Sequence, residues 1–270
     1  MTNFEKRSQP TDLTRPAREY WWWPNRSPQS TRPTILFFGG AGTDYITRIV
    51  HLLAPFIKNG NFGVWMMPGR GNRSDEPDPT DIRTLAQEIA STIVSLQLPR
   101  PILVGYSFGG LLAYLVCQEL ERRDFPIGRL VPVAGVDPLK WRLISMYCML
   151  RGGRDAYLRR GARGYDSTGV EPTIPFADPD LVAEARERGI ADFRLGLQYV
   201  RHKRVATSIT DVSASDDKLI RFNNPLRWKR FTTGEFESIV ITGDHFFYQR
   251  APEKLARVLS NVADHAYNCY

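Results

Sequence analysis

The sequence has little cysteine and no long hydrophobic run. Its 3 cysteines, Cys117, Cys148 and Cys269, lie far apart and match neither a disulfide framework nor a metal-binding spacing. No apolar stretch approaches the ~18 residues that a membrane-spanning helix needs. Residues 1–7 lack the apolar core of a secretory signal. These absences predict a cytoplasmic protein with no membrane span and no bound metal.

Negative charge is also in short supply. The chain has 29 Asp and Glu against 36 Lys and Arg, which gives a formal net charge of +7. This excess suits an anionic partner, such as a phosphate-bearing group or an acidic protein surface, and equally an ordinary solvated surface. No helix-turn-helix, zinc-finger or RNP pattern accompanies the charge, so we expect no nucleic acid as a partner.

Hydrophobic segments alternate with helical patterns along most of the chain. Patterns of buried strands occupy residues 34–38, 63–67, 101–104, 130–136, 205–212 and 238–242. Helical spacing occupies residues 44–57, 81–96, 110–122 and 252–262. Strands that alternate with helices predict an α/β fold, in which a mostly parallel central sheet is flanked by helices.

Two parts of the chain depart from this alternation. Residues 1–33 are polar and proline-rich apart from Tyr20–Trp23, and predict an N-terminal arm whose aromatic anchor packs on a domain of residues 34–270. Residues 139–203 contain one helical pattern, at 181–200, and predict an inserted helical lid. Five arginines of this insertion are candidates for contact with an acidic partner or a phosphate, and equally for a solvated surface: Arg151, Arg154, Arg159, Arg160 and Arg163.

The most informative motif is Gly105-Tyr106-Ser107-Phe108-Gly109. It closes one of the apolar strand patterns and opens a helical one. A G-x-S-x-G sequence between a buried strand and a helix is typical of the nucleophile elbow of α/β-hydrolases. Glycine is needed on both sides because neighbouring elements crowd the turn and leave no room for a Cβ. The motif predicts Ser107 as a nucleophile.

A serine hydroxyl becomes a good nucleophile only when a neighbouring base takes its proton. His245 is the preferred base, because it follows the last predicted strand, where the hydrolase fold delivers its histidine. It also allows the chain order serine, aspartate, histidine. The remaining histidines lie in the first helix, in the lid insertion and in the C-terminal tail: His51, His202 and His265.

The base needs a carboxylate that accepts its ring N–H and fixes its tautomer. Asp137 is the preferred candidate, because it ends the strand that follows the helix of the nucleophile. Asp216 and Asp217 are alternatives, because they follow the next strand. Asp244 is disfavoured, because a side chain adjacent to the base in sequence diverges from it. The sequence leaves the choice between Asp137 and Asp217 open.

The oxyanion formed during attack on a carbonyl needs preorganised N–H donors. One predicted donor is the backbone amide of Phe108, directly after the nucleophile. The other is expected in the glycine turn after the first strand, at Gly40 or Ala41. This turn, Gly39–Gly42, lacks the spacing of a phosphate-binding loop, so nucleotide binding is not expected.

Four segments together resemble one family, the thioesterases of non-ribosomal peptide and polyketide biosynthesis, which include free-standing type II editing enzymes. The resemblance covers residues 34–262. The segments are Phe37-Phe38-Gly39-Gly40-Ala41-Gly42, Met67-Pro68-Gly69-Arg70-Gly71, Gly105-Tyr106-Ser107-Phe108-Gly109-Gly110 and Gly243-Asp244-His245-Phe246-Phe247. The second and fourth are more specific to the family than the serine motif.

The resemblance implies an α/β-hydrolase fold with a lid, Ser107 as nucleophile, His245 as base and oxyanion donors at Ala41 and Phe108. It implies no cofactor, because the acyl thioester substrate is presented on the phosphopantetheine arm of an acyl or peptidyl carrier protein. The first loop departs from the family pattern F-P-x-A-G-G, with Gly39 in place of the proline and Thr43 in place of the last glycine.

The family resemblance does not decide which aspartate pairs with the histidine, because the two kinds of thioesterase carry it at different positions. Type II editing enzymes carry it after the later strand, which implies Asp217. Type I releasing domains carry it after the earlier strand in a V-D-P-like context, which Val136-Asp137-Pro138 resembles. We therefore expect a serine thioesterase of natural-product, including antibiotic, biosynthesis with Asp137 as acid. The alternatives are a carboxylesterase or lipase for small esters and a non-catalytic scaffold protein of the hydrolase fold.

Overall fold

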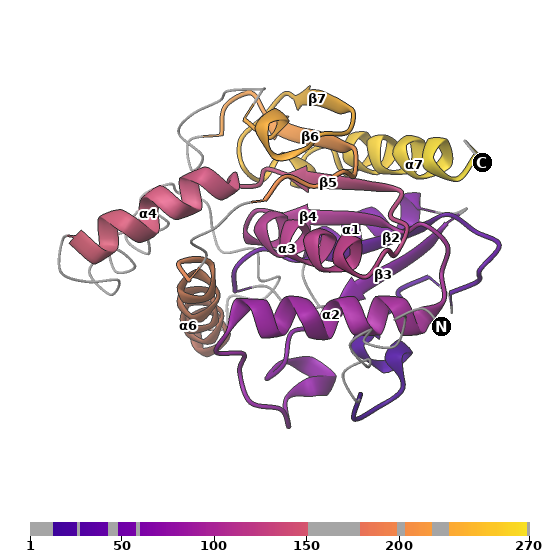
Figure 1. Ribbon diagram of the computed structural model, residues 1–270. Coiled ribbons are helices and arrows are strands. Elements are labelled where there is room, and N and C mark those ends of the chain that lie inside the picture. Colours follow the sequence, from indigo (N-terminus) through magenta and orange to yellow (C-terminus); the bar gives the residue numbers. More distant parts are fainter. Residues whose placement is uncertain are drawn as a thin grey trace, which may run out of the picture.

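The computed structural model describes residues 13–25, 28–42, 48–57, 60–150, 179–198, 203–217 and 227–268. The five lid arginines between Arg151 and Arg163, and the candidate histidine His202, lie outside these residues. The elements of the described part surround one central sheet (Figure 1).

The sheet has seven strands in the order β1-β3-β2-β4-β5-β6-β7. Their bounds are β1 Trp21–Trp22, β2 Thr34–Phe38, β3 Asn61–Trp65, β4 Ile102–Tyr106, β5 Arg129–Val133, β6 Ile209–Ala214 and β7 Phe236–Ile241. All neighbouring strands from β3 to β7 are parallel, and β1 pairs antiparallel with β3. The prediction of a mostly parallel sheet is confirmed.

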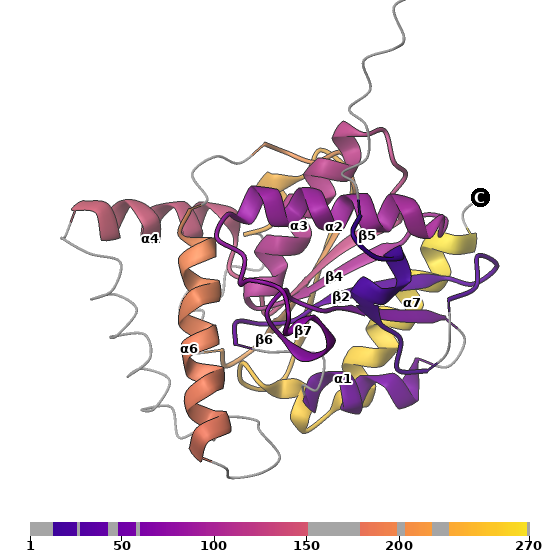
Figure 2. The ribbon, with the colours of Figure 1, turned by 90° about the horizontal axis from the view of Figure 1, so that it is seen from below.

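Helices cover both faces of the sheet. Their bounds are α1 Arg48–Leu53, α2 Ile82–Leu96, α3 Phe108–Arg122, α4 Pro138–Leu150, α6 Pro179–Gly196 and α7 Pro252–Asn268. Figure 2 shows α2 and α3 on one face and α1 and α7 on the other. Among the described helices, none is long and apolar enough to cross a membrane.

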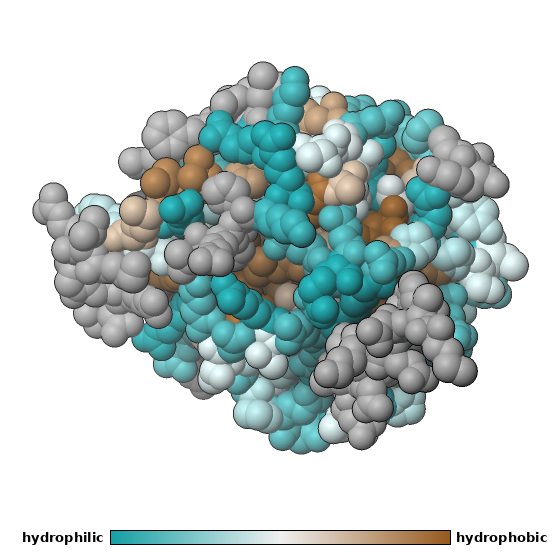
Figure 3. All heavy atoms as spheres, viewed as in Figure 1, coloured by the Kyte–Doolittle hydropathy of each residue, from teal (hydrophilic) through white to brown (hydrophobic). Residues whose placement is uncertain are grey.

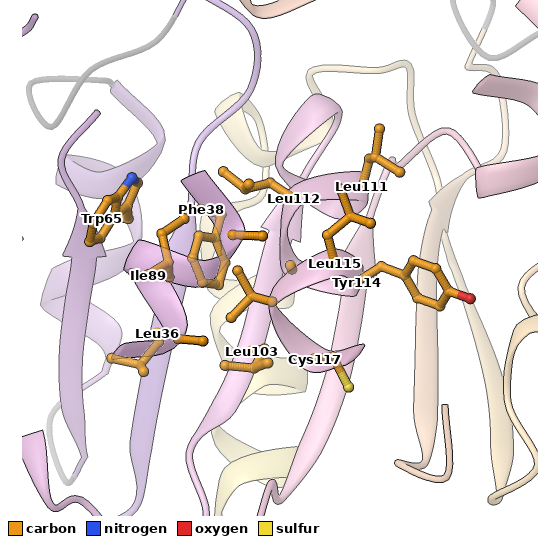
Figure 4. Close-up of a cluster of buried hydrophobic side chains, with 14 of the residues drawn as sticks. Leu36, Phe38, Trp65, Ile89, Leu103, Leu111, Leu112, Tyr114, Leu115 and Cys117 are labelled. Carbon is orange, nitrogen blue, oxygen red and sulfur yellow. The ribbon is translucent and has the colours of Figure 1, made fainter. Parts of the chain in front are cut away.

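The hydrophobic core lies in two layers, one on each face of the sheet. In the layer under α2 and α3, Phe38 and Leu103 of the sheet meet Ile89 and Leu112 of these helices (Figure 4). Helix α2 begins where the Asp81 side chain accepts a hydrogen bond from the Thr84 amide (2.7 Å), as an N-cap residue does. Because β2 and β4 are buried along their whole length, their C-terminal ends are held rigidly where the motifs follow.

The aromatic anchor of the N-terminal arm packs on the domain, as the sequence predicts. Trp21 and Trp22 form β1, and the Trp21 indole donates a hydrogen bond to the Thr92 hydroxyl (3.2 Å). The Tyr20 ring stacks on Trp65 at a centroid distance of 6.1 Å. Part of the arm is therefore an edge strand of the sheet.

Several element boundaries differ from the expected ones. The strand expected at 63–67 is β3, two residues earlier, and the strand expected at 205–212 is β6, Ile209–Ala214. Val205 forms only an isolated bridge with Thr232. In the described part of the helix expected at 44–57, α1 ends at Leu53 and a 3₁₀ turn follows. The turn begins at Ala54-Pro55, where a proline lacks the amide that would continue the α-helix.

The described part of the insertion that the sequence predicts as a lid contains α4 and α6. Figure 1 shows α4 extending away from the sheet, and α6 contacts α3. Three large side chains of α4 are exposed, Leu143, Met146 and Tyr147. Figure 3 shows hydrophobic surface over this projecting helix.

Candidate active site

Ser107 lies at a sharp turn between β4 and α3. Its backbone angles are φ 54° and ψ −114°, which an L-residue rarely adopts. The Ser107 amide donates a hydrogen bond to the Val133 carbonyl (2.9 Å), and the Gly110 amide donates to the Ser107 carbonyl (3.1 Å). The serine is therefore held in a strained conformation by the neighbouring strand β5 and by its own helix.

The glycines on either side of the serine are required by close backbone contacts. A Cβ on Gly105 would lie 2.1 Å from the Gly109 carbonyl oxygen. A Cβ on Gly109 would lie 2.2 Å from the carbonyl oxygen of Phe38, the last residue of β2. Helix α3 can therefore begin directly against the end of β2 only because these positions have no side chain.

His245 follows β7 and is buried, with 4% of its surface exposed. Its ring lies 5.3 Å from the ring of Tyr106, the residue before the serine, and the Tyr106 hydroxyl donates a hydrogen bond to the His245 carbonyl (3.0 Å). The Phe246 ring contacts the imidazole edge-on at 5.1 Å. The loop after β7 thus brings the predicted base to the serine turn, across the ends of the intervening strands.

The carboxylate that pairs with His245 is Asp217. Its Oδ2 lies 2.7 Å from His245 Nδ1, and its own exposure is 7%. The pairing follows from topology, because β6 and β7 are adjacent and parallel, so the residues after their C-terminal ends are neighbours. The remaining ring nitrogen, Nε2, is then available to face a reacting group.

The preference for Asp137 as the partner of His245 is wrong. The Asp137 Oδ1 accepts hydrogen bonds from the amides of Leu139 and Lys140, both at 3.1 Å. Asp137 therefore acts as the N-cap of α4, with Pro138 in the first helical position. The other two aspartates also have local partners: Asp216 accepts from the Ser215 hydroxyl, and Asp244 accepts from the Phe246 amide.

Further charged groups lie near the Asp217 side of the site. Arg227 Nε lies 3.3 Å from Oδ2 of Asp211, a residue of β6, and both side chains are buried. Burial raises the pKa of Asp211 to about 6, while Arg227 acts in the opposite direction. Burial lowers the pKa of Lys140, and the nearby Asp137 and Asp217 oppose that shift. The acid of the pair with His245 therefore lies in a region of low solvent access and mixed charge.

The loop after β2 runs beside the serine. A Cβ placed on Gly40 would lie 3.5 Å from the Ser107 Cβ. Ala41 and Gly42 form the turn that follows, and Gly42 has φ 74°. On the other side of the serine, Phe108 is the first residue of α3, where backbone amides have no acceptor within the helix and carry the positive end of its dipole. The loop after β2 and the first residue of α3 therefore both lie next to Ser107.

Sequence reasoning did not single out Asp192 of α6. Its carboxylate is buried and pairs through both oxygens with Arg70, at 2.9 and 2.6 Å. Its Oδ2 also accepts a hydrogen bond from the Gly42 amide (2.8 Å). The available signal was an acidic residue on an apolar helix face, three residues after Gly189 and three before the buried Leu195.

The comparisons with known proteins point to one family. A family model described as the thioesterase domain matches residues 51–265. A probable cadicidin biosynthesis thioesterase of Streptomyces griseus is 28% identical over 183 residues, which cover 67% of this chain and 48% of that protein. The gramicidin S biosynthesis protein GrsT of Aneurinibacillus migulanus is 23% identical over 239 residues, which cover 84% of this chain and 87% of that protein. The chain thus spans about half the length of the first of these relatives.

A solved structure has the same fold. It is the type II thioesterase BorB from the borrelidin biosynthetic cluster, with a TM-score of 0.71 and 20% identity over 88% of this chain and 95% of that chain. Together with the strand order, this likeness confirms the α/β-hydrolase fold predicted from the sequence.

Proposed function

Because this chain belongs to the thioesterase-domain family, we propose that it cleaves acyl thioesters carried on the phosphopantetheine arm of an acyl or peptidyl carrier protein. The observation that carries the proposal is the buried pair of His245 and Asp217 beside the Ser107 turn. The names of the two relatives link them to cadicidin and gramicidin S biosynthesis, which supports a role in releasing or editing intermediates of natural products.

In the first step of the proposed reaction, Ser107 Oγ attacks the thioester carbonyl carbon while His245 Nε2 takes the hydroxyl proton. The Asp217 carboxylate holds Nδ1–H at 2.7 Å, which fixes the tautomer and stabilises the imidazolium that forms. The backbone amides of Ala41 and Phe108 donate to the oxyanion. Each such donor typically contributes about 3–4 kcal/mol of transition-state stabilisation.

The tetrahedral intermediate collapses when the carbon–sulfur bond breaks. The imidazolium of His245 returns its proton to the sulfur, and the departure is easy because a thiol with a pKa near ~8.5 is a fair leaving group. The products of this half-reaction are the free thiol of the carrier arm and an acyl ester on Ser107.

In the second half-reaction, water or a nucleophile on the acyl chain attacks the ester of Ser107. His245 takes the proton of the attacking group and returns it to Ser107 Oγ, which regenerates the enzyme. Water gives hydrolysis, and an internal hydroxyl or amine gives a cyclic product. The two outcomes use the same residues.

The test compares acyl-pantetheine thioesters, the same acyl groups on a carrier protein, and p-nitrophenyl esters. We expect the highest kcat/KM with the carrier-bound thioester, together with an acyl-Ser107 adduct in the intact mass that is absent from Ser107→Ala. Faster turnover of simple esters, with no gain from the carrier protein, would support a carboxylesterase instead. If a fluorophosphonate failed to label Ser107, a non-catalytic scaffold role would replace the proposal.

A further inference from the structure

Asp192 connects three separate parts of the molecule. It lies on the lid helix α6, it binds Arg70 of the loop after β3, and it accepts the amide of Gly42 in the loop after β2. The exposure of both charged side chains is about 1%, so the contact is closed to solvent. The helix also approaches the second loop through its backbone, because a Cβ on Gly189 would lie 3.7 Å from Gly42 Cα.

Arg70 projects from a turn that is fixed on its other side. The Arg73 amide donates to the Arg70 carbonyl, and the Gly69 amide donates to the Arg73 carbonyl, both at 2.9 Å. The Arg73 side chain is anchored in turn by Glu76 and Glu88, and its guanidinium lies 4.6 Å from the centre of the Tyr20 ring. The backbone of Arg70 is therefore held in place, and its guanidinium binds Asp192 from a fixed position.

The hydrogen bond from Gly42 to Asp192 orients the loop that carries Ala41. An amide has one hydrogen, so the Gly42 N–H points toward α6 and is not a donor to the oxyanion. Gly40 and Ala41 remain as the candidate donors of this loop, and the family resemblance implies Ala41. Fixing the peptide between Ala41 and Gly42 also limits rotation about the bonds of Ala41. The restraint matters because Gly42 has φ 74°, and a glycine can also adopt several other backbone conformations of similar energy.

We propose that Asp192 is a positioning residue, which sets the Ala41 amide for oxyanion binding by holding Gly42 from the lid helix. The inference rests on the proposed acyl-transfer function of Ser107. In this proposal, the position of the oxyanion donor depends on the contact between Asp192 of α6 and Arg70. Asp192 itself does not touch the reacting atoms.

Two double variants isolate the hydrogen bond from the ion pair. Both carry Arg70→Met, so no buried cation is left unpaired; one adds Asp192→Asn and the other Asp192→Leu. Asparagine and leucine are similar in size, but only asparagine offers an oxygen to Gly42. The single variant Ser145→Ala is a matched control, because it removes a buried hydrogen bond between α4 and Leu197 (2.6 Å) without contact with Gly42.

Each variant is tested with an acyl-pantetheine thioester and with a trifluoromethyl ketone that forms an oxyanion adduct with serine. The corresponding alcohol, which forms no adduct, is the reference inhibitor. We expect the leucine variant to have a kcat and a ketone affinity about 10- to 100-fold below those of the asparagine variant, with KM and alcohol affinity unchanged. Ser145→Ala should keep kcat and ketone affinity within about 2-fold. Equal kcat and ketone affinity in the two double variants would overturn the inference.

Two further measurements keep the outcome decisive. If a double variant does not fold, amide hydrogen exchange of Gly42 in the wild-type chain replaces it: slow exchange supports the contact with Asp192, and exchange at the rate of a free peptide overturns it. If the wild-type chain cleaves p-nitrophenyl esters but not thioesters, the proposed substrate is wrong. The comparison of the double variants on esters still tests the positioning role, because ester cleavage uses the same oxyanion donors.

Discussion

Replacing Asp217 by asparagine is the sharpest test of the proposed site. The Asp217 Oδ2 lies 2.7 Å from His245 Nδ1 in a buried environment, so asparagine removes the charge that stabilises the imidazolium and allows the wrong tautomer. In a serine, histidine and aspartate triad, this change lowers kcat by about 10⁴-fold. At about 1.36 kcal/mol per decade, the transition state should lose about 5.5 kcal/mol.

Asp137→Asn is the matched control. Asp137 Oδ1 accepts from two amides at the start of α4, and asparagine caps a helix about as well as aspartate does. The side-chain oxygen is kept, so we expect kcat to stay within about 3-fold of the wild-type value.

The assay follows thiol release from an acyl-pantetheine thioester under single-turnover conditions, which separates acylation of Ser107 from later steps. Thermal melting checks that both variants are folded. The assignment of Asp217 would be refuted if Asp137→Asn lowered the acylation rate as much as Asp217→Asn, or if Asp217→Asn kept full turnover.

Three further predictions concern stability. Burial raises the pKa of Asp211 to about 6 in the fold, from 3.8 for an ordinary aspartate. The native state therefore holds an extra proton between these two pKa values, and the free energy of unfolding falls by on the order of 3 kcal/mol as pH rises through them. Urea unfolding at pH 4.5 and 7 should show about 2 kcal/mol of this fall in the wild-type chain and not in Asp211→Asn. An identical fall in both chains would contradict the raised pKa. Gly109→Ala should destabilise the fold by roughly 1–3 kcal/mol or more, because its Cβ would lie 2.2 Å from the Phe38 carbonyl oxygen. The same clash should lower the labelling of Ser107 by a fluorophosphonate. A melting curve identical to that of the wild-type chain would refute the contact. Trp21→Ala should lower the free energy of unfolding in denaturant by about 3–5 kcal/mol, because it removes a buried ring. We expect kcat to be retained, because this ring lies at the edge of the sheet. A loss of kcat in the folded variant would show that the arm also shapes the site.

The serine turn and the histidine loop were predictable because their signals are local. Gly105 and Gly109 flank Ser107 with the spacing that a crowded turn demands, and His245 follows a strand pattern directly. The backbone contacts at both glycines give the physical reason for that spacing.

The acid that pairs with His245 could not be chosen from local sequence signals alone. Asp137 and Asp217 each follow a strand and each satisfies the chain order, so only the positions of β5, β6 and β7 in space separate them. One local signal did bear on the choice: aspartate followed by proline is a common start of a helix, and α4 begins at Pro138. The partners of Asp192 were beyond prediction, because Arg70 and Gly42 lie more than a hundred residues away along the chain.

Strand β1 also protects the sheet. Trp21 and Trp22 pair with Trp65 and Val64 of β3, whose backbone would otherwise present unpaired N–H and C=O groups at that position. Open edges of sheets recruit strands from other molecules. In a chain shortened to begin after β1, this edge would be exposed next to a cluster of aromatic rings. We expect such a chain to self-associate, although the truncation does not touch the serine turn. The tryptophan-rich arm thus covers an edge to which a second copy of the chain could otherwise add a strand.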